Sequence, residues 1–144
     1  MEKAFEVGET VIIGLATDEF SERYPKEHPI SSYAFRRRQL RSLLNALGVV
    51  PRATIVPLKD AFGSAATDGS IEALIVSRET EHTGQEINKQ RAAGGLKPLT
   101  FLVIDMILAD DRLPISTTRI RRRELDREGH LLKMGSRSNR CARI

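Results

Sequence analysis

The residues best suited to chemistry in this sequence are three hydroxyl side chains followed by a cation: Ser116, Thr117, Thr118 and Arg119. They follow an apolar segment and a turn that contains Pro114, and a helical pattern begins at about Thr117. Free N–H groups at a helix start, hydroxyls and arginine all hold phosphate oxygens, so the segment predicts an anion site. Ser and Thr are also ordinary capping residues before a helix, and a purely structural role stays open.

The elements that position this segment follow from hydrophobic periodicity. Apolar segments rich in β-branched residues predict strands over 10–16, 53–58, 73–77 and 98–108. Most are nearly continuous in apolar residues, as strands buried on both faces are. Helical spacing predicts helices over 33–47, over 80–93 and from about 117, and residues 1–6 predict the last turns of a helix that Gly8 ends. Strands alternating with helices indicate an α/β domain with a mainly parallel sheet.

Length and composition fit one globular domain. The chain has 144 residues, of which 40% are hydrophobic and 29% charged. We expect a domain over 1–132 and a flexible basic tail over 133–144, where apolar periodicity is lost. No apolar run approaches the roughly 20 residues of a membrane helix, and the first residues do not resemble a secretory signal, so we expect a cytoplasmic protein without a membrane partner. A single cysteine, Cys141, excludes an internal disulfide.

The chain has a formal net charge of +4, and many of its arginines lie in two clusters. The first contains Arg36, Arg37, Arg38 and Arg41, and the second contains Arg119, Arg121, Arg122 and Arg123. Such clusters either meet phosphate or form solvated helix faces. A nucleic-acid-binding domain is therefore one alternative, although 5% aromatic residues without tryptophan leave few stacking platforms for bases.

A resemblance to a known family favours one of these possible functions. Residues 114–120, PISTTRI, resemble the ISSTRI-type signature of the nucleotidyltransferase superfamily, in which Ser and Thr at a helix start hold the nucleotide triphosphate. Further segments resemble archaeal-type phosphopantetheine adenylyltransferases in order and spacing, between about residues 4 and 132: 11–20 (VIIGLATDEF), 59–64 (KDAFGS), 72–79 (EALIVSRE), 86–91 (EINKQR) and 103–106 (VIDM).

The resemblance implies a Rossmann-like fold and adenylyl transfer from ATP, with Mg²⁺, to 4′-phosphopantetheine in coenzyme A synthesis. Ser116, Thr117, Thr118 and Arg119 would hold the triphosphate, and Ser77 with Arg78 would border the nucleoside. Thr17, Asp18, Phe62 and Gly63 would line the crevice. Arg38 would either reach the substrate phosphate or belong to a solvated face. Ligands of parallel sheets bind beyond the carboxyl ends of the strands, which independently places most of these residues around one crevice.

The sequence departs from the family pattern in one respect. The superfamily has an HxGH-type loop between its first strand and first helix, whereas His28, His82 and His130 lie far apart here and none has a Gly-His partner. We therefore assign no catalytic residue and no metal ligand. We expect the first strand, the phosphate loop and most of a helix to be missing, about 15 to 25 residues on ordinary element lengths, which would leave a gap in the sheet.

Two alternatives keep the fold. One is a nucleotide-binding pseudoenzyme that lacks the histidine loop. The other is a sister cytidylyltransferase acting on a polar head group, because the turn at 116–119 is shared across the superfamily.

Overall fold

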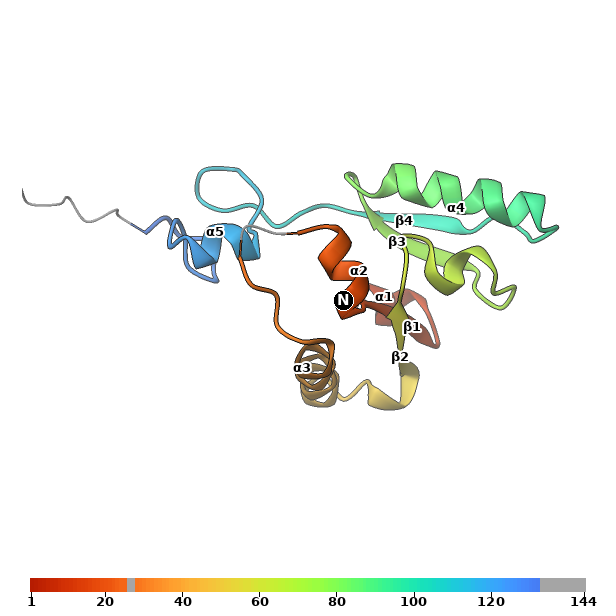
Figure 1. The fold of residues 1–144 in the computed structure, drawn as a ribbon, viewed down its shortest axis with the longest axis horizontal. Coiled ribbons are helices and arrows are strands. Elements are labelled where there is room, and N and C mark those ends of the chain that lie inside the picture. The colour runs from red at the N-terminus through yellow and green to blue at the C-terminus, as the bar shows by residue number, and fades with distance from the viewer. Residues whose placement is uncertain (26–27, 133–144) are drawn as a thin grey trace, which may run out of the picture. The chain divides into compact units, whose positions relative to one another are not determined.

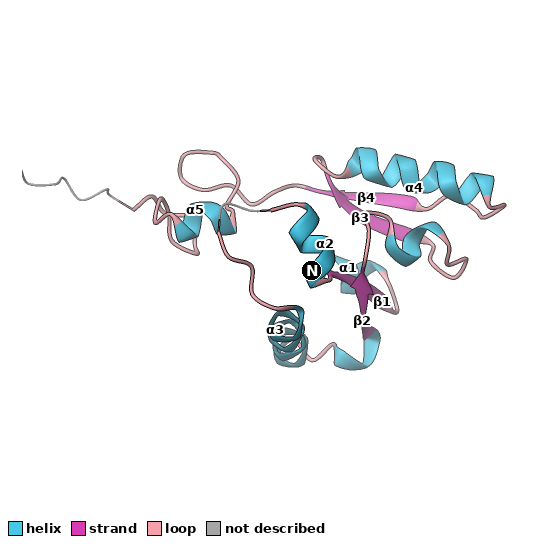
Figure 2. Ribbon diagram, in the orientation of Figure 1, coloured by secondary structure: helices cyan, strands magenta, loops and turns pink. Residues whose placement is uncertain are grey.

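The computed structural model describes residues 1–25 and 28–132, and Figures 1 and 2 show strands alternating with helices along them. The elements are α1 (Glu2–Val7), β1 (Val11–Ala16), α2 (Asp18–Arg23), α3 (Tyr33–Ala46), the 3₁₀ turn η1 (Val50–Arg52), β2 (Ala53–Leu58), the 3₁₀ turn η2 (Gly63–Ala66), β3 (Ala73–Ser77), α4 (Glu81–Ala93), β4 (Thr100–Ile104) and α5 (Thr117–Arg121). The chain divides into two compact units, Met1–Asp105 and Met106–Ile144.

The strands of the first unit form two parallel pairs. β1 pairs with β2 from Val11 opposite Ala53 to Ala16 opposite Leu58, and β3 pairs with β4 from Ala73 opposite Thr100 to Ser77 opposite Ile104. Each pair is connected through a helix, α3 or α4, as parallel strands require. The α/β class with parallel strands is confirmed. Among the described residues the two pairs form separate two-stranded sheets, and the missing first strand stays a prediction.

The expectation of strands buried on both faces is wrong. Val76 is the one buried residue within the four strands, while Ile12 and Val103 are 41% and 43% exposed. Side chains of a strand project to the two faces of its sheet, so they are buried only where a helix or loop packs on that face.

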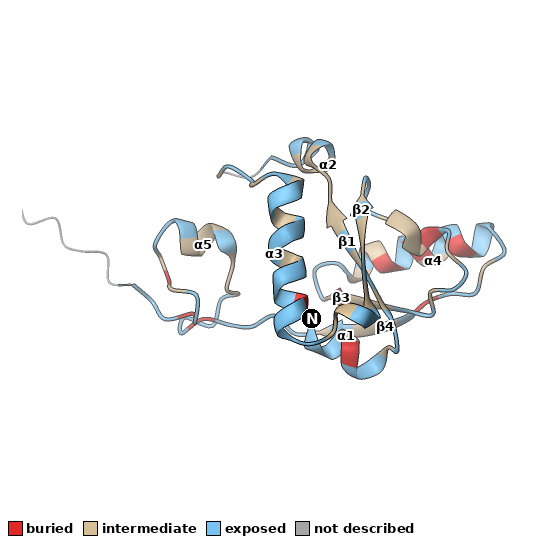
Figure 3. Ribbon diagram, turned by 90° about the horizontal axis from the view of Figure 1, so that it is seen from below, coloured by how far each residue is buried: buried red, intermediate tan, exposed pale blue. Residues whose placement is uncertain are grey.

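The helix α4 packs more closely than α3 (Figure 3). Gly84, Ile87 and Arg91 of α4 are buried, whereas Leu44 is the only buried residue of α3. Ile87 forms a core cluster with Ala66 and Leu99. A side chain at Gly84 would press against the ring of Phe101 in β4, so glycine permits this close contact between helix and strand.

Arg91 organises this core through backbone hydrogen bonds. Its guanidinium is 1% exposed and donates to the carbonyl oxygens of Lys97, Ala65, Asp68 and Ile71 at 2.7–3.1 Å. Buried carbonyls without donors destabilise a fold, and this one side chain supplies donors to the segment before β3 and to the loop before β4.

Other boundaries differ in detail from the predictions. The strand predicted over 98–108 ends at Ile104, and Leu108 forms only an isolated antiparallel bridge with Pro114. The short helix α2 was not predicted. The tail predicted over 133–144 lies outside the described residues. Within the described part of the chain, none of the helices is long and apolar enough to span a membrane.

Candidate functional site

Thr17 and Asp18 follow the carboxyl end of β1, where they start α2. The backbone N–H of Thr17 donates to the carbonyl of Leu58 at the end of β2, and its hydroxyl oxygen accepts from the N–H of Phe20 at 3.1 Å. Thr17 is therefore an N-cap that is also fixed to the neighbouring strand. This accounts for the position of α2 at the edge of the pair.

Asp18 links α2 to α3. Its Oδ1 accepts from the backbone N–H of Tyr33 at 2.6 Å and from the guanidinium of Arg36 at 2.8 Å. Arg36 also donates to the carbonyls of Ala16 and Ser31. Two charge-assisted bonds on one carboxylate oxygen hold both helix starts together, so Asp18 positions this edge of the first unit.

A hollow of about 500 Å³ opens beside Asp18, lined by Asp18, Ser21, Glu22, Pro25, His28, Ile30 and Ser32. The Nε2 atom of His28 is buried and has no hydrogen-bond partner among the described residues. An unsatisfied buried nitrogen is destabilising unless a ligand or water meets it. The sequence analysis missed His28 because no neighbouring residue forms a motif with it.

Phe62 and Gly63 follow β2 in a turn that Asp60 organises. The Asp60 carboxylate accepts from the backbone N–H groups of both residues at 2.7–2.8 Å. These bonds lower the pKa of Asp60, and the bond from Gly63 has the larger effect. Gly63 has a φ of +54°, and a Cβ there would collide with Leu58. The side chain of Phe62 packs against the core cluster of Ala66, Ile87 and Leu99, so Phe62 is also a packing residue.

Ser77 and Arg78 lie at the carboxyl end of β3. Ser77 donates its backbone N–H to the hydroxyl of Thr80 at 2.9 Å. Arg78 donates to Asp105 at 3.2 Å, and both side chains are at least 80% exposed. Since Ser77 lies opposite Ile104 in the register, this pair connects the ends of two adjacent strands. An exposed ion pair contributes little to stability, and it leaves Arg78 able to meet a ligand.

The second unit contains the segment with the three hydroxyl residues, which follows a tight hairpin. Ala109 and Leu113 close the hairpin with a 2.8 Å backbone hydrogen bond, and Arg112 takes a φ of +63° at its tip. Ser116 then caps α5, and its hydroxyl oxygen accepts from the N–H of Arg119 at 3.3 Å. The capping role that the sequence left open for Ser116 is therefore observed.

Arg119 is held within the second unit. Asp111 and Glu124 pair with its guanidinium, which also donates to the carbonyl of Pro114 at 3.2 Å. Its side chain is 16% exposed. The hydrogen bond with Arg119 lowers the pKa of Asp111, and the bond with Asp111 raises that of Arg119. A phosphate at Arg119 would share it with these carboxylates.

The hydroxyls of Thr117 and Thr118 form no hydrogen bond with any described residue. Thr117 is exposed and Thr118 half-buried at the start of α5. Ser116 and Arg119, in contrast, already have protein partners, and anion binding by this segment stays a prediction.

The structure brings some predicted site residues together. The loops of Thr17 and Gly63 both contact Leu58 at the end of β2. Ser77 and Arg78 end the other strand pair, and the Ser116 turn belongs to the second unit, so a single crevice containing all of them stays a prediction. The guanidinium of Arg38 lies 5.8 Å from the ring centre of Phe35, and its suggested role in phosphate binding also stays a prediction.

Comparison with known families gives a match over most of the chain. The profile of the cytidylyltransferase-like family matches residues 1–123. A crystal structure of a protein of unknown function from Archaeoglobus fulgidus is similar in fold, with a TM-score of 0.61 and 22% identity, and it covers 72% of this chain and 78% of that one.

Curated relatives are more similar in sequence. A phosphopantetheine adenylyltransferase from Methanothermobacter thermautotrophicus is 41% identical over 133 residues, which are 92% of this chain and 79% of the relative. Another from Methanopyrus kandleri is 36% identical over 82% of this chain and 74% of its own length. A bifunctional phosphopantetheine adenylyltransferase/NTP phosphatase from Thermoplasma volcanium is 36% identical over 92% of this chain, which covers 40% of that protein.

Proposed function

The chain belongs to the cytidylyltransferase-like family, and we propose that it is a phosphopantetheine adenylyltransferase. It would transfer AMP from ATP to 4′-phosphopantetheine, giving dephospho-coenzyme A and pyrophosphate. The observation that carries this proposal is the 41% identity to a phosphopantetheine adenylyltransferase over 92% of the chain. The positions of the predicted residues at strand ends and at a helix start fit this chemistry.

In this reaction a phosphate oxygen of 4′-phosphopantetheine attacks the α-phosphorus of ATP, and the bond from that phosphorus to the bridging oxygen of pyrophosphate breaks. Both reactants are anions, and no covalent bond to the protein forms. The protein therefore acts by holding the two groups in line and by supplying donors where negative charge develops.

The triphosphate would bind at the start of α5. The free hydroxyls of Thr117 and Thr118 donate to its oxygens, while Ser116 keeps the helix start capped. Arg119 supplies positive charge, which its two carboxylate partners orient and partly neutralise. Mg²⁺ enters as the counterion of ATP. The described residues contain no cluster of three or more His, Cys, Asp or Glu side chains suited to a metal ion.

The first unit would bind the remaining groups at the carboxyl ends of its strands. Arg78 and Ser77 border the nucleoside, and the loops of Thr17 and Gly63 line the crevice. His28 adds an unsatisfied ring nitrogen in the hollow beside Asp18, where a phosphate oxygen of 4′-phosphopantetheine would satisfy it.

The test is an assay of pyrophosphate release from ATP and Mg²⁺, with and without 4′-phosphopantetheine. The proposal expects release that depends on 4′-phosphopantetheine and a product with the mass of dephospho-coenzyme A. Saturable ATP binding without turnover would instead support the pseudoenzyme. Release from CTP but not from ATP would support a cytidylyltransferase.

A further inference from the structure

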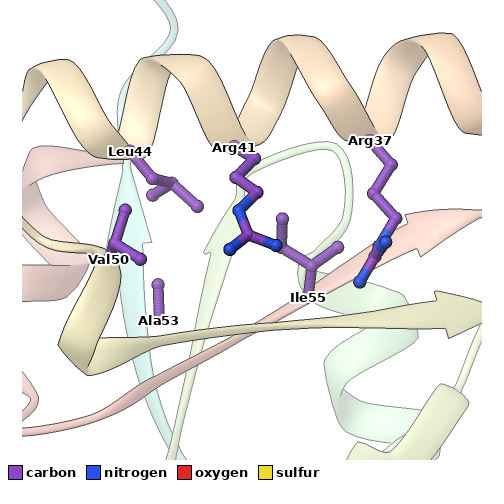
Figure 4. Close-up of a pocket in the computed structure, with 6 residues that line it drawn as sticks. All are labelled: Arg37, Arg41, Leu44, Val50, Ala53 and Ile55. Carbon is purple, nitrogen blue, oxygen red and sulfur yellow. The ribbon is translucent and has the colours of Figure 1, made fainter.

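Two arginines of α3, Arg37 and Arg41, line a hollow beside the amino half of β2. The hollow has a volume of about 170 Å³ and is lined by Arg37, Arg41, Leu44, Val50, Ala53 and Ile55. Figure 4 shows the side chains of Arg37 and Arg41 extending from α3 toward the strand that carries Ala53 and Ile55. Arg37, Arg41 and Leu44 share one face of α3 because they are spaced by four and three residues.

The guanidinium groups of Arg37 and Arg41 have no partner among the described residues. No described residue forms a hydrogen bond or an ion pair with Arg37 or Arg41. The neighbouring Arg36, in contrast, donates to Asp18 and to two backbone carbonyls. Like charges one helical turn apart repel each other.

The position separates this hollow from the proposed catalytic edge. Val50 belongs to the turn before β2, and Ala53 and Ile55 are its first and third residues, so the hollow lies along the amino half of the strand. Thr17 and Gly63 follow the carboxyl ends of β1 and β2. Ile55, the lining residue nearest that edge, is three residues from Leu58, which is roughly 10 Å along a strand.

We propose that this hollow binds the phosphate group of a small organic molecule. Two arginine forks one helical turn apart provide several N–H donors to phosphate oxygens, and the apolar floor suits a carbon body attached to the phosphate. The small volume admits a phosphate and a few carbon atoms, and the rest of a larger ligand would extend into solvent.

Phenyl phosphate is a suitable probe because it joins a phosphate to an apolar ring. Binding is measured by calorimetry at constant ionic strength on the whole chain and on Arg37→Gln/Arg41→Gln. A matched variant, Lys89→Gln/Lys97→Gln, removes the same charge from exposed positions of the same unit. We expect saturable binding by the whole chain and by the matched variant, and affinity about tenfold or more weaker in the arginine variant.

Methyl NMR locates the binding site without relying on any variant. Phenyl phosphate should shift the methyl signals of Leu44, Val50 and Ile55 with one common dissociation constant. Equal binding by all three proteins, no saturable binding, or shifts confined to Thr117 and Thr118 would each overturn the proposal. Because the readout is binding rather than turnover, a failure here is separate from a failure of the adenylyltransferase assay.

Discussion

The carboxylate of Asp111 accepts hydrogen bonds from both terminal nitrogens of Arg119, which is eight residues further along the chain. This two-point contact joins the hairpin to the start of α5, next to the threonines proposed to hold phosphate. The positive charge of Arg119 is therefore both fixed in place and partly neutralised before any nucleotide arrives.

Replacing the carboxylate should separate these two effects. We expect Asp111→Asn to lower the melting temperature, because the amide has no charge and only one oxygen to accept from the two nitrogens of Arg119. The same change should tighten ATP binding, because one negative charge beside the triphosphate is removed. Thermal unfolding and ATP calorimetry measure the two effects. A variant with unchanged ATP affinity would mean that Arg119 only supports the hairpin.

The hydroxyl of Thr118 provides a more direct test of phosphate binding. Thr118→Ala should weaken ATP binding or turnover by roughly 1 to 3 kcal/mol, the range for a lost hydrogen bond to a charged group. Thr118→Ser retains the hydroxyl and serves as the control. Because the hydroxyl has no described protein partner, the melting temperature should change little. A lower melting temperature with intact ATP kinetics would assign Thr118 a structural role.

His28 should matter for one substrate only. We expect His28→Ala to raise the KM for 4′-phosphopantetheine about tenfold, which corresponds to the loss of one hydrogen bond of about 1.4 kcal/mol, with the KM for ATP unchanged. His82→Ala is the matched control, because His82 is exposed and only contacts Thr83. Equal effects of the two replacements, or a change in the ATP KM alone, would contradict the assignment.

The bounds of most helices and strands could be predicted from the sequence, whereas the burial of the strand side chains could not. Strands β1, β2 and β3 and helices α3 and α4 begin and end within two residues of the predicted bounds, because apolar periodicity and Gly48 or Gly94 mark them. The low burial of Ile12 and Val103 depends on which elements pack on the faces of the two sheets, and local sequence does not contain that information.

In the candidate site, too, local features were predictable and contacts between distant residues were not. The sequence predicted a helix start at Thr117 and a cap before it, and both are observed, whereas phosphate binding by Thr117 and Thr118 stays a prediction. The partners of Arg119 could not be foreseen, because Asp111 reaches it only through the hairpin that has Arg112 at its tip. Arg91 was likewise unremarkable in sequence, since its four acceptors are backbone carbonyls from separate loops.

The turn at Gly63 should tolerate no side chain. Gly63→Ala adds a Cβ that collides with Leu58 and forces a positive φ on alanine, so we expect a loss of about 2 kcal/mol or more in the free energy of unfolding. Gly48→Ala is a matched control, with a φ of +69° and no atom near the added Cβ, and should cost only about 1 kcal/mol. Chemical denaturation of both variants measures the difference. Equal losses in the two variants would show that the positive φ, and not the collision with Leu58, accounts for the cost of a side chain at position 63.

The turn that ends the described chain should respond to pH in two directions. Asp126 accepts from the backbone N–H and from the ring of His130. These bonds lower the pKa of Asp126, and the hydrogen bond with Asp126 raises the pKa of His130, with smaller contributions from Asp110 and Glu128. A raised histidine pKa means that its stabilisation is complete below the ordinary value of 6.5 and is lost as pH rises through the folded value. A lowered aspartate pKa means that its stabilisation is present above the ordinary value of 3.8 and is lost as pH falls through the folded value.

The turn should therefore be most stable between about pH 4 and pH 6.5. An NMR titration of the His130 ring protons should give a pKa above 6.5 in the native chain, and Asp126→Asn should bring it down toward 6.5. The backbone N–H of Leu132, which donates to Glu124 across the same turn, should exchange with solvent faster above that pKa. A His130 pKa that is the same in both proteins would show that Asp126 holds the backbone of the turn but exerts no effect on the ring.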